Sequence, residues 1–269
     1  MIKGVPVLKD INSTKEQDKM AEQIYRAYLN VEKIPNISLI NQGITSEEAY
    51  QIQKKYLAMR LDSDAICGFK AGLCTSGAQK KLDYTEPLSG ILYASGNYRE
   101  RSVPMYPSGR MIIETEIGLV MGRDISAHIE SVAEMKEAID NVMPAIEFPD
   151  HNFADIEHFT ALDLISCNVI ASGCMEGIKV PAVEYDLNNI KVSLYYENEV
   201  IDSGIGSNTW KNDQWESARW LVNSIIDHGY VIKKGSFLLT GALGSMVTAR
   251  KGSYRADYGK LGIIEFDIV

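Results

Sequence analysis

Two glutamates lie two residues apart in the strongly apolar segment 112–122, which reads IIETEIGLVMG. On a β-strand, residues two apart point to the same side, so Glu114 and Glu116 would point together, roughly 7 Å apart. Like charges on a mostly buried strand repel each other and are costly to desolvate unless a cation lies between them. A hard divalent ion such as Mg²⁺ or Mn²⁺ takes oxygen ligands and would reconcile the pair. The alternative is an edge strand with a solvated acidic face.

A third carboxylate, Glu147, ends the apolar run 142–148. By itself Glu147 fits a structural role, but beside Glu114 and Glu116 it becomes the natural third ligand. Asp150 follows it and is either a secondary partner of the site or a loop residue.

Lys70 is the complementary cation, in the segment 68–73 (GFKAGL). Its ammonium would lie among small and apolar residues, and Gly68 and Gly72 would allow close backbone approach to a ligand. A lysine near carboxylates and a metal could pair with an anionic substrate or transfer a proton. The alternative is a surface lysine on an edge strand. A Thr240-Gly241 turn further along the chain offers a hydroxyl and free N–H groups to an anion, although most such turns only reverse the chain.

The composition is that of an ordinary globular protein rather than a disordered chain: 269 residues, 45% hydrophobic, with a formal charge of −9. An acidic chain has no electrostatic footprint for nucleic acid. No apolar run reaches the length of a membrane span, and residues 1–10 lack the apolar core of a secretory signal, so we expect a cytoplasmic protein. The four cysteines lie at positions 67, 74, 167 and 174 without metal-ligand spacing, and we expect buried free thiols.

Hydrophobic periodicity predicts the elements that position these residues. A helix over 15–29 follows Ser13 or Thr14 as its cap, and a second over 46–61 opens with a capping box at Thr45. Further helices are predicted over 131–141 and 214–228, the latter ended by Gly229. Strands are predicted over 65–73, 89–94, 112–121, 142–148, 164–171, 190–197, 236–240, 246–249 and 263–269. We expect a mixed α/β fold with a helical region over 1–63 and a catalytic region over 64–269, joined as one continuous unit.

Together these segments resemble the 2-keto-4-pentenoate hydratase and 2-oxo-3-hexenedioate (4-oxalocrotonate) decarboxylase family of the fumarylacetoacetate hydrolase superfamily. The matching segments follow one another in order over most of the chain. They are 48–53 (EAYQIQ), 68–73 (GFKAGL), 86–93, 114–117 (ETEI), 145–147 (AIE), Asp163, Asn168, 220–223 (WLVN), 240–241 (TG) and 255–262 (RADYGKLG).

The resemblance implies a rolled mixed β-sheet core with an N-terminal helical region, assembled as a homo-oligomer. It implies that Glu114, Glu116 and Glu147 are Mg²⁺ or Mn²⁺ ligands and that Lys70 is the active-site lysine. The residues that line the substrate pocket are then Leu73, Leu88, Ile170, Thr240 and Gly241. The implied partner is a small 2-oxo acid, with neither nucleic acid nor membrane involved.

Two departures from the hydratase pattern decide which reaction we favour. Hydratases carry Pro-Asp-Phe-Gly where this chain has Pro87-Leu88-Ser89-Gly90. A hydratase serine aligns near Ile170 or Ala171, with Ser172 close by. Hydration needs a group that activates or delivers water at C4, with protonation at C5. Decarboxylation needs only that the electrons of the breaking C5–C6 bond flow through C3=C4 toward the 2-oxygen. We therefore favour a decarboxylase over a hydratase.

Two other readings stay open. One is a non-catalytic homologue that binds 2-oxo acids, against which the retained carboxylates and lysine argue. The other is a C–C hydrolase of acylpyruvates, which would need a water-activating His–Glu pair on a lid. His151 and the pair Glu157-His158 are the mid-chain residues that could supply it, and we expect them to be surface residues.

Overall fold

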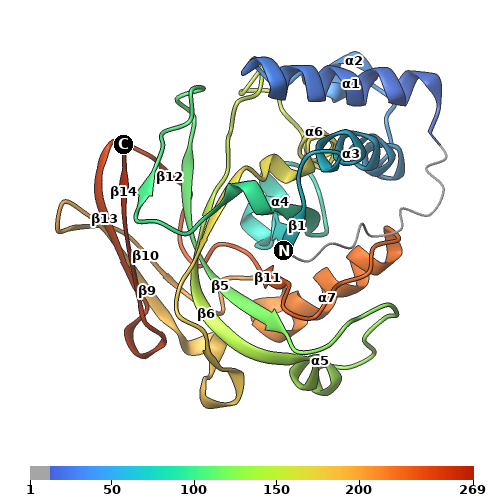
Figure 1. Cartoon of the computed structure of the whole chain (residues 1–269). Helices are drawn as coiled ribbons and strands as arrows, with labels where there is room; N and C mark the ends of the chain where they lie inside the picture. Colours follow the sequence, from blue (N-terminus) through green and yellow to red (C-terminus); the bar gives the residue numbers. More distant parts are fainter. Residues whose placement is uncertain (1–12) are drawn as a thin grey trace.

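The computed structural model describes residues 13–269, whose largest element is a strongly curled nine-stranded sheet (Figure 1). The strand order is β2-β1-β11-β5-β6-β7-β3, with β12 paired to β5 and β8 paired to β6. The sheet is mixed, because β1 runs parallel to β11 while β5 and β6 are antiparallel. Its strands are β1 (Ile66–Gly72), β2 (Leu88–Tyr93), β3 (Asn97–Tyr98), β5 (Ile112–Met121), β6 (Ile139–Phe148), β7 (Gly173–Glu176), β8 (Val180–Pro181), β11 (Phe237–Leu239) and β12 (Val247–Thr248).

A second sheet of five strands has the order β10-β9-β13-β14-β4. Its strands are β4 (Ser102–Val103), β9 (Lys191–Tyr196), β10 (Glu199–Ile205), β13 (Gly252–Asp257) and β14 (Ile263–Ile268). The rolled mixed α/β core expected from the sequence is confirmed.

Seven α-helices lie within residues 13–269. They are α1 (Lys15–Asn30), α2 (Ile37–Ile40), α3 (Ser46–Leu61), α4 (Ser76–Lys81), α5 (Val132–Ala138), α6 (Ala161–Ser166) and α7 (Gln214–Asp227). Both predicted N-terminal helices are present, and Thr14 and Thr45 form the capping boxes that start them. Among these residues, no helix has the length and apolar content needed to cross a membrane.

The strand predicted over 164–171 was wrong. Thr160 and Asp163 form a capping box that starts helix α6 instead, and a 3₁₀ turn over Asn168–Ile170 follows it. The periodicity of a short apolar run does not distinguish a buried strand from a buried helix. Here the capping box indicates the helix. Strands β10 and β13 were not predicted, since much of each is polar and half-exposed.

The register of the large sheet sets Lys70, Glu114, Glu116 and Glu147 on one face. Glu114 lies opposite Glu147, Glu116 opposite Ala145, and Lys70 opposite Leu239, which itself pairs with Gly118. Directly paired residues share a face, and so do residues two apart on one strand.

That face lies on the inside of the curl. Apolar side chains from strands far apart in the strand order form one cluster there, among them Leu92 of β2, Val120 of β5 and Cys174 of β7. Strands β2 and β7, from opposite sides of the strand order, also contact each other, so the sheet curls over on itself, as the long, bent strands β5 and β6 show (Figure 1). The four charged residues therefore share an enclosed space with an apolar cluster.

Other residues of this chain fill the space next to the glycines beside Lys70. This corrects the expectation that these glycines expose backbone to a ligand. A Cβ on Gly72 would lie 2.5 Å from Val169 Cγ1, and one on Gly68 would lie 2.5 Å from the Phe237 carbonyl oxygen. On the neighbouring strand, a Cβ on Gly90 would come within 3.0 Å of Asn168 Oδ1. The 168–170 turn thus packs directly onto the bare backbone of β1 and β2.

Gly72→Ala tests this packing. The added methyl overlaps Val169, so we expect the free energy of unfolding to fall by about 1–3 kcal/mol. The matched control is Gly77→Ala in α4, where a Cβ meets nothing within 4 Å. That variant should be neutral or up to about 1 kcal/mol more stable, because alanine favours a helix over glycine. Equal stabilities of the two variants in urea unfolding would refute the packing argument.

Candidate active site

Glu114, Glu116 and Glu147 form a cluster in which one carboxylate oxygen of each lies within 4.8 Å of the others. Glu116 and Glu147 are completely buried, and Glu114 is partly exposed. Strand β5 lies between β11 and β6, so the alternative of an edge strand with a solvated acidic face is wrong. The expected alternation of Glu114 and Glu116 is present, and the register adds Glu147 to the same group.

Lys70 is the cation of this cluster. Its Nζ lies 2.6 Å from Glu147 Oε1, and the lysine is 3% exposed. The same Nζ donates a hydrogen bond to the carbonyl oxygen of Val169 at 3.2 Å. One buried positive charge therefore faces three carboxylates.

Burial, together with the charges of the neighbouring groups, shifts the pKa of every member. Burial raises the pKa of Glu116 well above its ordinary value, and the charges of Glu147 and Glu114 raise it further. Burial also raises the pKa of Glu147 to about 7, although Lys70 acts in the opposite direction. For Lys70, burial lowers the pKa, but Glu147 and Glu114 outweigh this and leave the pKa above its usual range. The cluster thus lacks positive charge when its carboxylates are ionised.

Glu116 is held by backbone groups from distant segments. The N–H of Gly241 donates to Glu116 Oε2 at 2.9 Å, and the left-handed φ of +113° at Gly241 allows this turn. The hydroxyl of Tyr258 accepts a hydrogen bond from the Glu116 N–H and donates one to the carbonyl of Ala145, which fixes β5 against β6. The spacing of residues did not identify Tyr258, although it lies in the last of the matching segments.

Two carboxylate oxygens of the cluster have no partner among the described residues. Glu116 Oε1 and Glu147 Oε2 are buried and accept no hydrogen bond. Buried polar atoms normally have a partner, and a carboxylate without one is especially costly. Three carboxylates that supply oxygen donors and carry uncompensated negative charge fit a hard divalent cation such as Mg²⁺.

The residues expected to line a substrate pocket are distributed over several environments. Leu88 is fully buried and lies opposite Gly72, on the same face as Lys70. Thr240 is buried with its hydroxyl bonded to Gln214, which the sequence did not single out. Gly241 supplies the hydrogen bond from this turn to the acidic cluster. Leu73 has a left-handed φ of 53°, and its carbonyl accepts a hydrogen bond from Gln79.

Ile170 and Ser172 line a cavity of about 280 Å³ beside α1. Arg60 and Tyr56 of α3 line the same cavity, and Ser172 donates its hydroxyl hydrogen to the Ile170 carbonyl. None of the four charged cluster residues lines this cavity. The structure therefore places Ile170 and Ser172 apart from Leu88.

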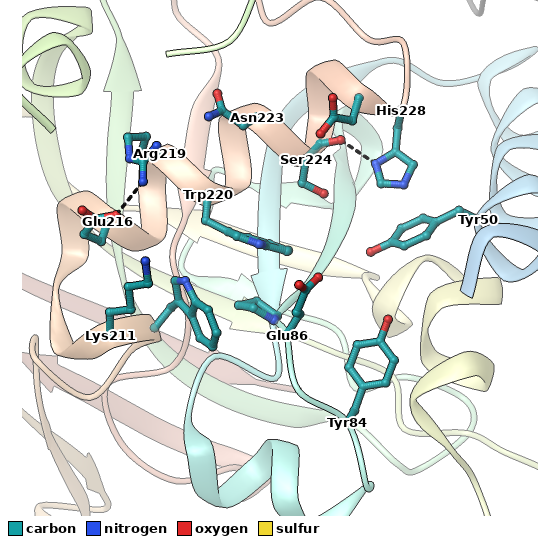
Figure 2. Close-up of a pocket in the computed structure, with 13 residues that line it drawn as sticks. Tyr50, Tyr84, Glu86, Lys211, Glu216, Arg219, Trp220, Asn223, Ser224 and His228 are labelled. Atoms are coloured by element: carbon teal, nitrogen blue, oxygen red, sulfur yellow. Dashed lines mark hydrogen bonds and ion pairs between the residues drawn. The ribbon is translucent and has the colours of Figure 1, made fainter. Parts of the chain in front are cut away.

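A groove of about 320 Å³ lies between α3, the 84–87 segment and α7 (Figure 2). Tyr50 and Ser224 in its wall both bond to Ser89, which points to the opposite face of β2 from Leu88. Figure 2 shows Arg219 paired with Glu216, and the His228 ring bonded to the carbonyl of Ser224. The groove thus lies behind the sheet, while the charged cluster lies in front of it.

The residues considered for a hydrolase or for support of the metal are engaged elsewhere. His158 is exposed and pairs with Asp155 rather than with Glu157. His151 is half-buried against Phe153 and Phe159, and burial lowers its pKa. Asp150 accepts a hydrogen bond from Ser108 and behaves as a loop residue. The four cysteines are free thiols; three are buried, and Cys67 is half-buried.

Several known proteins are similar to this one over most of its chain. No protein-family model matches it. It is 27% identical over 256 residues to a 2-oxo-hept-4-ene-1,7-dioate hydratase from Escherichia coli, covering 91% of this chain and 95% of that protein. It is 29% identical over 220 residues to a 2-keto-4-pentenoate hydratase from Burkholderia vietnamiensis, covering 80% and 83%. A 4-oxalocrotonate decarboxylase from Pseudomonas sp. strain CF600 is 24% identical over 252 residues, covering 90% and 93%.

Solved structures share the fold. A 4-oxalocrotonate decarboxylase from Pseudomonas putida G7, complexed with magnesium and adipate, superposes with a TM-score of 0.85 and 23% identity. The match covers 96% of this chain and 100% of that one. The same enzyme is also known complexed with calcium and acetate. A putative fumarylacetoacetate hydrolase family protein from Yersinia pestis CO92 matches with a TM-score of 0.55 at 14% identity, over 75% of this chain and 92% of that one.

These relatives are enzymes, and they agree with the resemblance of the motif series. Most of this chain is thus similar to 2-keto-4-pentenoate hydratases and to a 4-oxalocrotonate decarboxylase, and it has the fold seen in proteins of the fumarylacetoacetate hydrolase family.

Proposed function

We propose that this protein is a divalent-metal-dependent decarboxylase of 2-oxo-alkenedioates such as 2-oxo-3-hexenedioate. The observation that carries the proposal is the buried cluster of three glutamates and one lysine, with Leu88 on the same face of the neighbouring strand. The activities named for the relatives and the magnesium and calcium complexes of the structural neighbour support it.

In this proposal Glu114, Glu116 and Glu147 hold the ion, Mg²⁺ or Mn²⁺. The unpartnered oxygens of Glu116 and Glu147 are the donors without another role, and the partly exposed Glu114 gives the site its opening. When bound, the ion supplies positive charge for the carboxylate and 2-oxygen of a 2-oxo acid. Lys70 lies within reach of the same anion and can hold or deliver a proton.

Leu88 favours decarboxylation over hydration. On the face that carries Lys70, the neighbouring positions of β1 and β2 are Leu88, Gly72 and Gly90, and Val169 covers the two glycines. None of these side chains can activate water. Apolar surroundings also disfavour a charged carboxylate relative to the neutral CO₂ that leaves when the C5–C6 bond breaks.

The second candidate is a 2-keto-4-pentenoate hydratase, which adds water to 2-hydroxypenta-2,4-dienoate. The names of the E. coli and B. vietnamiensis relatives favour it. Against it stands Leu88 at the position of the hydratase aspartate. We further propose that the protein acts in the cytoplasm as a homo-oligomer, with a small 2-oxo acid as its substrate.

The proposed metal site makes a prediction about pH. Because the folded Glu147 has a pKa of about 7 against an ordinary value of 4.5, the folded state binds more protons than the unfolded chain between these values. In metal-free protein, the contribution of Glu147 to the free energy of unfolding therefore falls as the pH rises through this interval. Mg²⁺ binds deprotonated carboxylates, so the increase in Tm caused by saturating Mg²⁺ should grow over the same interval.

Glu116→Gln should abolish this Mg²⁺-dependent increase in Tm, because it removes one charged donor and keeps the side-chain shape. Glu176→Gln is the control, since Glu176 pairs with Arg99 and Lys179 outside the cluster. Scanning calorimetry at several pH values measures both. A Glu116→Gln protein that Mg²⁺ still stabilises fully would remove Glu116 from the site.

Lys70→Met keeps the length of the side chain and removes its charge. We expect kcat to fall by about 10²- to 10⁴-fold, the range for loss of a proton-transfer group, while Mg²⁺ affinity is retained or increased. Lys55→Met, which removes a partly exposed partner of Asp18, is the control and should leave kcat unchanged. Steady-state kinetics that show the same kcat for Lys70→Met and wild type would exclude Lys70 from the reaction.

The two activities are separated by incubating the Mg²⁺-loaded protein with 2-oxo-3-hexenedioate and, separately, with 2-hydroxypenta-2,4-dienoate. CO₂ release and loss of the dienoate absorbance are followed independently. We expect CO₂ release from the first substrate, with little hydration of the second. Hydration without decarboxylation would establish the hydratase instead.

Leu88→Asp should raise the ratio of hydration to decarboxylation, because it restores a group that can activate water beside Lys70. Leu88→Asn adds polarity without a carboxylate and is its control. If Mg²⁺ binding shows both variants to be folded and the ratio stays unchanged, position 88 does not select the reaction.

A further inference from the structure

The 168–170 turn that follows α6 has an unusual backbone. Asn168, Val169 and Ile170 have φ values of 61°, 53° and 50°, the one run of three left-handed non-glycine residues within residues 13–269. Asparagine tolerates this region, but the β-branched Val169 and Ile170 are strongly disfavoured there. Such a backbone conformation is strained and persists only where its surroundings impose it.

The side chain of Asn168 provides that constraint. Its Oδ1 accepts a hydrogen bond from the Ile91 N–H at 2.8 Å, and its Nδ2 donates to the Ile91 carbonyl at 3.0 Å. Nδ2 also donates to the hydroxyl of Tyr93 at 3.2 Å. The side-chain amide thus makes the pair of hydrogen bonds to Ile91 that a neighbouring strand would otherwise make. Asn168 is completely buried. With Gly72 and Gly90 leaving room for Val169, the turn is held against the sheet on both sides.

The consequence reaches Lys70. The carbonyl of Val169, at the centre of the turn, accepts a hydrogen bond from Lys70 Nζ at 3.2 Å, while Glu147 lies on another side of the same ammonium. An ammonium has three hydrogens, so two have protein partners and one has none among the described residues. Fixing two of the three directions leaves the remaining N–H with a defined direction.

We propose that Asn168 is a positioning residue for Lys70. It holds the left-handed turn whose Val169 carbonyl orients the ammonium, so that the free N–H points toward the bound 2-oxo acid. This inference rests on the proposed function for the role of Lys70 in the reaction, but not for the orientation itself. A misplacement of about 1 Å in a group that acts on substrate costs about 100-fold in rate.

The test compares Asn168→Ala with Gln53→Ala. Gln53 is also a buried amide bonded to β2, since it donates to the Ser89 carbonyl of that strand and to the Ile165 carbonyl of α6, the helix that precedes the turn. It makes no contact with the 168–170 turn among its hydrogen bonds, so it reports the structural loss of a buried amide alone. Stability is measured for both by urea unfolding.

We expect Asn168→Ala to lower kcat about 10- to 100-fold, with KM and the Mg²⁺ affinity nearly unchanged. Gln53→Ala should keep kcat near the wild-type value at a similar loss of stability. Equal effects of the two substitutions on kcat would overturn the proposal. If Asn168→Ala fails to fold, Asn168→Asp retains the Oδ1 acceptor but lacks the Nδ2 donor, and the same comparison applies.

A second readout needs neither metal nor turnover. An amine-directed acylating reagent is applied to the metal-free proteins, and the modification of Lys70 is followed by peptide mass spectrometry. We expect Lys70 to react several-fold faster in the Asn168 variant than in Gln53→Ala, because its ammonium is no longer held. Equal rates would show that Asn168 does not fix Lys70. A wild-type protein that turns over neither substrate would refute the proposed function, while these rates would still test the positioning.

Discussion

Three carboxylates and a single lysine share the inside of a curled sheet, and this imbalance of buried charge is the constraint on which the rest of the site depends. Ionised carboxylates repel each other at this distance and lose their hydration, so the fold needs compensation for them. Lys70 compensates part of the charge through Glu147, and the Gly241 N–H compensates part at Glu116. The remaining buried oxygens have no partner within residues 13–269, which is the physical reason to assign the site to a divalent cation.

The same region shows how packing serves the charged groups. Gly72 and Gly90 leave the backbone of β1 and β2 bare, and the 168–170 turn lies against it. Strained backbone of this kind is stable only when many contacts impose it, and it is concentrated at functional sites. Here it presents a carbonyl to the one cation of the cluster. Tyr258 has a comparable role on the other side, because its hydroxyl joins β5 to β6 beside Glu116.

Much of this arrangement could be predicted from the sequence, but only for features that depend on residues close together in the chain. The alternation of a strand predicts that Glu114 and Glu116 share a face, and capping residues predict where α1 and α3 begin. The pairing of Glu114 with Glu147 depends on a register between distant segments, for which resemblance to a family was the available guide. The 168–170 turn could not be predicted, since valine and isoleucine carry no signal for left-handed backbone. For the same reason the sequence does not show that Gly72 leaves room for Val169 rather than for a ligand.

The central claim is that Glu114, Glu116 and Glu147 bind one divalent cation between them. Crystals of the protein grown or soaked with Mn²⁺ test it most directly, because anomalous scattering locates the ion independently of any assumption about the reaction. We predict one strong anomalous peak coordinated by all three carboxylates, at about 2.0–2.3 Å from their oxygens. A peak elsewhere, or a coordination sphere that excludes two of the three glutamates, would contradict the account.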